Sequence, residues 1–526
     1  MRRLSPTAAA VLAALAFVAA VAPVAAATDE KARARAERAL REGEYEAAEK
    51  VYRELLAKDP RDTAARLGLS RALLKQRKHL EAYDHAARVI ARDPENARAH
   101  ALLGAALLGS GDFRLSVEEF RTALTFKEDE AIAIAGLAMV DFYENRITQS
   151  LAGLRRASFI DPGEPDYIFN LGQVAARNER YKEAADAYDT FLRVAPRTDA
   201  DRRARIRGLI DFLRYLGQQG NLLSVGGPGS VSVPFELVNS RPVVSVRVNG
   251  SSKALRFVID TGAGMCVISE EAAERIGVKA VARGGMARAV GGEGRFEIVY
   301  GFLQSLNLGE AKVERVPVYI RRFYNEQEPV DGYIGLSVLA KYMTVVDYGG
   351  HEMLMLREEE AKRAAALPAP AGSFEVPIRT TSSGFWSGEV SFEVLEKPAN
   401  FIIDTGASIS VVSKALAARA GLERYAQTGF IKVYGAAGPA ENIQTILLPR
   451  LSLGPHTWQN IYAAVLDMEA INETAGFAQT GIVGGNLLRR YRVTFDFPHG
   501  VIRLDPDPRV TPQDDRGKPA IVSGES

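Results

Sequence analysis

Residues 28–220 repeat one arrangement of polar and apolar positions. Asp-Pro pairs recur at multiples of 34 residues, at Asp59-Pro60, Asp93-Pro94 and Asp161-Pro162, and Ala195-Pro196 falls on the same grid. Proline fixes φ and has no backbone N–H, so it ends one helix and can begin the next. Leucines, alanines and aromatic residues fill the intervals between the prolines. The pattern predicts a series of helix hairpins, one in each interval.

Small residues recur where the two helices of a unit must cross closely. Gly104 and Gly172 occupy this position in the first helix, and Ala48, Ala82 and Ala184 in the second. Helix hairpins with a 34-residue period are typical of tetratricopeptide repeats, which the segment resembles. We expect five repeats and a capping helix. Such arrays usually bind a peptide or protein on a concave surface, although a spacer or oligomerisation arm is the alternative.

After the repeats the sequence pattern changes to short runs of β-branched residues separated by turn residues. This pattern predicts an all-β region. The decisive feature is a duplication. The segment Phe257–Ala263 (FVIDTGA) is followed 144 residues later by Phe401–Ala407 (FIIDTGA). Each copy continues into an apolar strand that ends in serine, at Ser269 and Ser413.

The match extends downstream of the aspartates. Each copy has a glycine turn 31 residues after its aspartate, at Gly291 and Gly435. Two apolar residues then precede Gly335 in the first copy and Gly484 in the second, now at an offset of 149. Two halves of one fold, the second with a short insertion, explain both offsets.

An apolar strand, Asp-Thr-Gly-Ala, a glycine turn and a later apolar-apolar-Gly resemble the retropepsin-like and pepsin-like aspartic proteases. The resemblance implies a bilobal all-β fold with both lobes in one chain and a peptide or protein substrate. It implies two catalytic carboxylates, a support for them and two flap hairpins that close over substrate. The expected catalytic pair is Asp260 and Asp404, the support is Thr261, Gly262, Thr405, Gly406, Gly335 and Gly484, and the flap residues are Val290, Gly291, Gly292, Tyr434 and Gly435.

The chemistry of paired carboxylates fits this expectation. Peptide hydrolysis needs a base to activate water and an acid to protonate the departing group. Two carboxylates in contact cannot both ionise, so they share one proton and supply both roles, as is known for aspartic proteases. The alternatives are a degenerate protease fold kept as a non-catalytic peptide-binding scaffold, and an envelope-assembly adaptor. Cys266 is expected to pack as a small apolar residue rather than act as a nucleophile.

The full expectation is a multidomain chain, with an all-α tetratricopeptide solenoid followed by a bilobal all-β aspartic protease fold. The predicted segments are a signal peptide (1–27), the repeat array (28–220), a linker (221–232), lobe 1 (233–356), an inter-lobe linker (357–373), lobe 2 (374–506) and a disordered tail (507–526).

The N-terminus predicts export. Arg2 and Arg3 precede an alanine-rich apolar stretch, and Ala25-Ala26-Ala27 offers a small-residue cleavage site. This is the layout of a secretory signal, so we expect a periplasmic or secreted protein with no stable membrane span after cleavage. An uncleaved anchor is the alternative, but Pro23 and the weakly apolar alanines favour cleavage.

Composition narrows the classes of function that remain open for this chain. The formal net charge is +1, with 66 basic and 65 acidic residues, which gives no indication of a nucleic-acid partner. The six histidines are scattered and the single cysteine has no partner for a disulfide. No metal site and no cofactor are expected.

Overall fold

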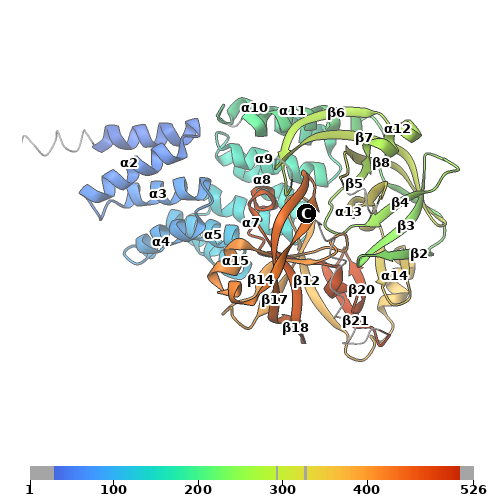
Figure 1. Cartoon of the computed structure of the whole chain (residues 1–526). Helices are drawn as coiled ribbons and strands as arrows, with labels where there is room; N and C mark the ends of the chain where they lie inside the picture. Colours follow the sequence, from blue (N-terminus) through green and yellow to red (C-terminus); the bar gives the residue numbers. More distant parts are fainter. Residues whose placement is uncertain (1–28, 199, 292–293, 325–328, 510–526) are drawn as a thin grey trace, which may run out of the picture. The chain divides into compact units, whose positions relative to one another are not determined.

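The computed structural model describes residues 29–198, 200–291, 294–324 and 329–509 (Figure 1). The predicted signal peptide, flap residue Gly292 and most of the predicted tail lie outside these ranges. The described chain divides into two compact units. The first unit contains residues up to Leu137 with two short later segments, 159–161 and 194–200. The second contains 138–158, 162–193 and everything from residue 201.

The first unit is built from helix hairpins. Two helices end shortly before the expected prolines, α2 at Lys58 and α4 at Ile90, and the side chains of Asp62 and Asn96 cap the helices that follow. The helices are residues 29–42, α2 (Tyr45–Lys58), α3 (Thr63–Lys75), α4 (His79–Ile90), α5 (Ala97–Ser110), α6 (Phe113–Phe126) and the first half of α7 (Ala131–Tyr143). The helical array predicted from the repeat is confirmed.

The small residues lie where helices cross. A Cβ atom at Gly104 would lie 2.7 Å from the Phe120 ring, and one at Gly172 would lie 2.9 Å from the Tyr188 ring. Real Cβ atoms do not approach that closely, so only glycine fits at either crossing.

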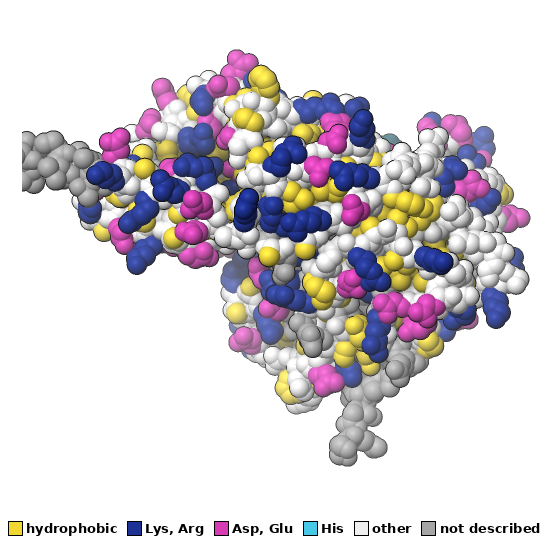
Figure 2. Space-filling view, turned by 90° about the horizontal axis from the view of Figure 1, so that it is seen from above, with side chains coloured by type: hydrophobic (Ala, Val, Ile, Leu, Met, Phe, Trp, Pro, Cys, Tyr) yellow, Lys and Arg dark blue, Asp and Glu magenta, His cyan; other side chains and the backbone are white. Residues whose placement is uncertain are grey.

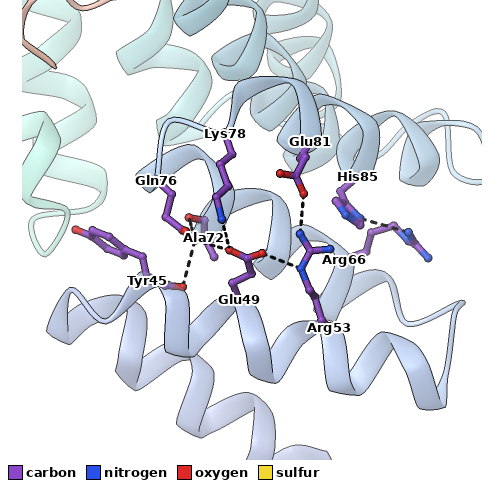
Figure 3. A network of polar contacts seen from close by, with 9 residues as sticks. All are labelled: Tyr45, Glu49, Arg53, Arg66, Ala72, Gln76, Lys78, Glu81 and His85. Carbon is purple, nitrogen blue, oxygen red and sulfur yellow. Dashed lines mark hydrogen bonds and ion pairs between the residues drawn. The ribbon is translucent and has the colours of Figure 1, made fainter. Parts of the chain in front are cut away.

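A polar network joins α2, α3 and α4 on one side of the first unit (Figure 3). Glu49 accepts hydrogen bonds from Gln76 (2.8 Å), Lys78 (2.9 Å) and Arg53 (2.8 Å), and Arg53 also pairs with Glu81 (2.7 Å). Burial opposes ionisation of Glu49, but the bonds from Lys78, Arg53 and Gln76 prevail and lower its pKa to about 2. The network therefore holds a carboxylate between neighbouring repeats at any ordinary pH.

The second unit combines the later helices with all the strands. Its helices are α8 (Ile147–Ile160), α9 (Pro165–Arg177), α10 (Tyr181–Val194) and α11 (Ala200–Leu216), of which α8, α10 and α11 have end residues in the first unit. The strands form two lobes, drawn in green to yellow and in orange to red in Figure 1.

Lobe 1 contains β1 (Ser224–Gly226), β2 (Ser230–Val238), β3 (Arg241–Val248), β4 (Leu255–Ile259), β5 (Cys266–Ser269), α12 (Glu270–Ile276), β6 (Ala280–Arg288), β7 (Arg295–Leu308), β8 (Ala311–Arg321), β9 (Gly332–Ile334), α13 (Leu336–Leu339), β10 (Met343–Asp347) and β11 (Glu352–Leu356).

Lobe 2 follows helix α14 (Glu358–Ala365). It contains β12 (Phe374–Thr380), β13 (Trp386–Phe392), β14 (Ala399–Ile403), β15 (Ser410–Ser413), α15 (Lys414–Arg419), β16 (Ala426–Gly435), β17 (Gly438–Leu453), β18 (His456–Leu466), α16 (Glu469–Ala475), β19 (Gly481–Val483), α17 (Gly485–Leu488), β20 (Tyr491–Asp496) and β21 (Val501–Pro506).

The two lobes have the same pairing scheme. In lobe 1, β4 runs parallel to β9 and β5 runs parallel to β8; in lobe 2, β14 runs parallel to β19 and β15 to β18. In each lobe the strand after the aspartate also pairs antiparallel with the short strand before the later glycine. The duplication predicted from the sequence is therefore a duplication of the fold.

One sheet belongs to both lobes. Its strands lie in the order β2, β11, β10, β20, β21, β12, and β10 of lobe 1 pairs directly with β20 of lobe 2, with Val345 opposite Thr494. A single hydrophobic core runs through the two lobes. The lobes are thus joined by backbone hydrogen bonds and shared apolar packing, so their relative position is fixed.

Basic and acidic side chains are interspersed over the face drawn in Figure 2, in keeping with the near-zero net charge. Within the described ranges, no helix is both long and apolar enough to cross a membrane.

Candidate active site

Each aspartate is presented at the end of a buried strand. Asp260 follows β4, and its backbone N–H donates to the Ile334 carbonyl (3.0 Å); Asp404 follows β14, and its N–H donates to the Val483 carbonyl (3.0 Å). The strand residues just before both aspartates are almost completely buried. A rigid strand that continues into a turn therefore fixes the position of each carboxyl group.

The two turns hold one another through their threonines. The Thr261 hydroxyl donates to the Ile403 carbonyl (2.8 Å), and the Thr405 hydroxyl donates to the Ile259 carbonyl (2.6 Å). Each hydroxyl also accepts the backbone N–H of the other threonine, at 3.1 Å in both cases. Both side chains are buried. This reciprocal set of four hydrogen bonds fixes the distance between the two turns.

Glycine is required directly beside each carboxyl group. The Gly262 N–H donates to Asp260 (2.9 Å) and the Gly406 N–H donates to Asp404 (2.7 Å). A Cβ atom at Gly262 would lie 2.5 Å from the carboxyl carbon of Asp404, and one at Gly406 would lie 2.6 Å from that of Asp260. Any side chain at either glycine would push the two carboxyls apart.

The carboxyl groups interact directly, and both aspartates are half-buried. Burial raises the pKa of Asp260 well above its usual range, and the charge of Asp404 and a hydrogen bond between the two side chains raise it further. Burial also raises the pKa of Asp404, but the hydrogen bond from Gly406 and others, including one from Ala407 (3.2 Å), counteract it. These hydrogen bonds favour the charge on Asp404 over Asp260.

The two later glycines lie against the segments that follow the aspartates. The Gly335 N–H donates to the sulfur of Cys266 (3.3 Å), and in the second lobe the Gly484 N–H donates to the hydroxyl of Ser410 (3.1 Å). A Cβ at Gly335 would meet the Met265 carbonyl oxygen at 2.5 Å. Cys266 is completely buried, as expected, and burial raises its pKa to about 11, so it is a thiol that replaces the serine of the other lobe.

The tips of the two flap hairpins meet. The N–H of Ala437, in the turn between β16 and β17, donates to the Val290 carbonyl (3.1 Å) in the turn between β6 and β7. A Cβ at Gly291 would lie 1.8 Å from the Gly438 oxygen, and one at Gly435 would lie 2.1 Å from the Val290 oxygen. The expected flap glycines are therefore needed for backbone-to-backbone contact between lobes.

Tyr434 lies apart from that contact. Its side chain is exposed and its ring is 5.5 Å from the Lys432 ammonium group. The structure thus brings together Val290, Gly291 and Gly435 at the tips, and turns the Tyr434 ring towards a surface lysine.

Helix α11 supports the flap of lobe 1, a feature with no motif in the sequence. Phe212 stacks on Tyr300 of β7 with ring centres 4.3 Å apart, and Tyr215 packs edge-on against Phe302 at 5.5 Å. A Cβ at Gly208 would lie 2.0 Å from the Arg283 carbonyl oxygen of β6, so the helix backbone rests directly on the flap strand.

An ion-pair cluster extends this support to lobe 2. Glu473 of α16 pairs with Arg205 of α11 (3.6 Å) and with Arg288 at the end of β6 (3.3 Å). One carboxylate of lobe 2 therefore bridges the helix and the flap strand of lobe 1.

A comparison with protein-family models finds a known kind of domain in each part of the chain. The model described as "Aspartyl protease" matches residues 244–338 and 390–487, one stretch in each lobe. Two models described as "Tetratricopeptide repeat" match residues 39–106 and 136–200. The chain carries an aspartyl protease domain behind tetratricopeptide repeats. Both parts of the predicted resemblance are confirmed. Among the described residues of the protease domain and the repeats, no three His, Cys, Asp or Glu side chains converge as metal ligands.

Solved structures resemble the two parts separately. An aspartic proteinase from Irpex lacteus is 14% identical over 54% of this chain and 99% of its own, with a TM-score of 0.38. A thermophilic tetratricopeptide-repeat protein from Thermus thermophilus is 20% identical over 35% of this chain and 98% of its own, with a TM-score of 0.30.

A curated relative matches part of the chain. The BBSome complex member BBS4 of Bos taurus is 20% identical over 158 residues, which is 30% of either chain. The present chain thus spans less than a third of the length of that relative.

The threonine hydrogen bonds predict a measurable loss of stability. Thr405→Val keeps the side-chain size but leaves the Ile259 carbonyl and the Thr261 N–H without their partner, so it should lower the free energy of unfolding by about 1–3 kcal/mol. Chemical denaturation followed by tryptophan fluorescence measures the change.

Thr494→Val is the matched control. Thr494 is equally buried in the shared sheet, and its hydroxyl has no hydrogen-bond partner among the described residues. Its replacement should leave stability unchanged or raise it. Equal losses in the two variants would show that the reciprocal bonds do not hold the turns together.

Proposed function

We propose that the protein is an aspartic endopeptidase in which Asp260 and Asp404 form the catalytic pair. The observation that carries the proposal is the direct contact of two half-buried carboxyl groups, one from each lobe, whose shared proton leaves one acid and one base. Around them, paired threonines and glycines hold the geometry and two flap tips meet. Each of these features serves hydrolysis of a peptide held beneath the flaps.

The hydrogen bonds favour a division of roles. Asp404 accepts N–H groups from Gly406 and Ala407, whereas Asp260 accepts one from Gly262, so the charge rests more readily on Asp404. In this proposal Asp404 takes a proton from water as the oxygen attacks the peptide carbonyl carbon. The protonated Asp260 donates a hydrogen bond to the carbonyl oxygen, and the proton held by Asp404 then passes to the departing amine nitrogen.

A second candidate is a non-catalytic scaffold that binds peptides between the lobes. The direct support of α11 for the flap of lobe 1 favours it, because a braced flap would open less readily for turnover. Against it, both carboxyls are present and in contact. The two candidates predict opposite results in a cleavage assay.

The repeats extend the proposal to partners. Because tetratricopeptide arrays commonly bind proteins, we propose that this one binds the substrate protein or a partner that delivers it. Exposed apolar side chains of the first unit, such as Leu80 and Phe159, are available for such contacts. A Phe159→Ser variant should then cleave protein substrates more slowly but short peptides at the wild-type rate.

We also propose that the mature protein begins near Thr28 and acts in the periplasm or outside the cell, on the basis of the N-terminal Arg-Arg, alanine-rich and Ala-Ala-Ala layout. N-terminal sequencing of protein from its native host tests this. Full-length protein in the cytosol would contradict it.

The catalytic pair is tested by Asp260→Asn and Asp404→Asn. Either variant should lose at least about 100-fold in peptide-hydrolysis rate, because one carboxyl group cannot act as both acid and base. Wild-type activity should also fall as the pH rises through the raised pKa of the pair, since the shared proton is then lost. The assay is digestion of a mixed-peptide library, with and without pepstatin.

Asp496→Asn is the control, because Asp496 ends β20 and accepts a hydrogen bond from His499 (2.9 Å). It should keep wild-type activity. A wild-type protein that binds peptides but cleaves none would favour the scaffold instead, and near-wild-type cleavage by either dyad variant would remove Asp260 and Asp404 from catalysis.

A further inference from the structure

A partly buried arginine lies in lobe 1 close to the carboxyl pair. Arg321 is the last residue of β8, opposite Ser269 in the parallel pairing with β5, the strand that follows the Asp260 turn. Its guanidinium carbon lies 5.7 Å from the centre of the Phe296 ring and 5.6 Å from that of Phe323. Arg321 and Asp260 are near enough for the charge of each to shift the pKa of the other.

The surroundings of Arg321 give its charge little direct compensation. Burial lowers the pKa of the guanidinium, yet its Nε has no hydrogen-bond partner and no carboxylate forms an ion pair with it among the described residues. Aromatic faces offset only part of the cost of removing a cation from water. The residue keeps some exposed surface, so a ligand can reach it.

A tyrosine lies beside this arginine, and the two residues, Arg321 and Tyr333, are called the wall of lobe 1 below. Tyr333 of β9 packs edge-on against Phe323 at 5.1 Å, and its hydroxyl is within electrostatic reach of Asp260, Asp404 and Arg321. Burial raises the pKa of this hydroxyl, so it stays protonated and is available as a hydrogen-bond donor.

The duplication provides an internal comparison. Ser269 lies opposite Arg321 in lobe 1, and the corresponding Ser413 lies opposite Leu466 in lobe 2. By the same pairing, Tyr333 corresponds to Ile482. Lobe 1 therefore has a cation and a phenol where lobe 2 has two aliphatic side chains. The scaffold does not need charge at these positions, which points to a role in recognition.

We propose that Arg321, with Tyr333 beside it, binds a substrate carboxylate near the scissile bond, so that the enzyme prefers peptides with an acidic group on the lobe 1 side of its cleft. The inference rests on the proposed peptidase function and adds the substrate class. The carboxylate could belong to an Asp or Glu side chain or to a peptide C-terminus, which share the chemistry that Arg recognises.

Cleavage-site profiling of a peptide library by mass spectrometry tests the inference. Wild-type protein should show acidic residues enriched at one position close to the cleaved bond. Replacing that residue, Glu by Gln, should lower kcat/KM about tenfold or more, the effect of losing one charge-assisted contact. Comparison of free and C-terminally amidated peptides shows which carboxylate is bound.

Three variants make the test specific. Arg321→Leu, which copies lobe 2, should abolish the Glu-over-Gln preference, measured as a ratio of kcat/KM values so that any change in overall rate cancels, and Arg321→Lys should retain part of it. Arg322→Leu is the matched control, because Arg322 is the exposed neighbour that packs over Tyr324 and should not affect the preference. Thermal melting of each variant checks that the fold is intact.

An unchanged carboxylate preference in Arg321→Leu would overturn the inference without affecting the proposed peptidase function. So would a wild type that prefers neither acidic residues nor free over amidated C-termini. If the wild type cleaves nothing, the peptidase proposal fails and the inference is decided by binding. Fluorescence anisotropy then compares labelled peptide pools that contain Glu or Gln. Tighter binding of the Glu pool to wild type but not to Arg321→Leu supports a carboxylate site, and equal binding of both pools contradicts it.

Discussion

Two half-buried acidic groups held in contact impose the constraint on which the rest of this structure depends. Asp260 and Asp404 repel each other when both are charged, and each is costly to bury. The protein keeps them together by fixing the backbone around them. The threonine hydroxyls of each turn bond to the other turn, and the glycines leave no atom that could separate the carboxyls. Behind these turns, the parallel pairs β4–β9 and β14–β19 and the shared six-stranded sheet transmit that rigidity to both lobes.

The two lobes share this framework but differ in their surfaces. Both present the same turn, the same supporting glycine and a flap hairpin whose tip meets that of the other lobe. Lobe 1 alone has the Arg321 and Tyr333 wall and the direct support of α11, through Phe212 stacked on Tyr300. A peptide between the lobes would therefore meet a charged and braced side and an aliphatic side. Such asymmetry suits a single chain, because a symmetric dimer of identical subunits presents the same residues twice.

Much of the site was predictable because its constraints are local. Backbone geometry that few other residues satisfy sets the Asp-Thr-Gly turns, the later glycines and the constant spacings. These features can therefore be recognised in the sequence. The repeat period was equally visible, since proline and small residues mark helix ends and crossings. The wall formed by Arg321 and Tyr333, and the packing of α11 on the flap of lobe 1, could not be predicted from the sequence in this way. They depend on side chains from distant segments, and nothing in the spacing of Phe212, Tyr300 or Arg321 marks them as neighbours. Tyr434 shows the same limit, because its place in a motif did not reveal which way its ring would point.

The central claim is that a single chain builds one complete site from its two halves. Mixing Asp260→Asn and Asp404→Asn proteins in equal amounts, and separately diluting the wild type, tests it most directly. If the site forms within one chain, the mixture stays as inactive as either variant, and the activity of each wild-type molecule is constant on dilution. Substantial recovery of peptide hydrolysis in the mixture, or loss of specific activity on dilution, would show that the carboxyl pair forms between chains and would contradict the account.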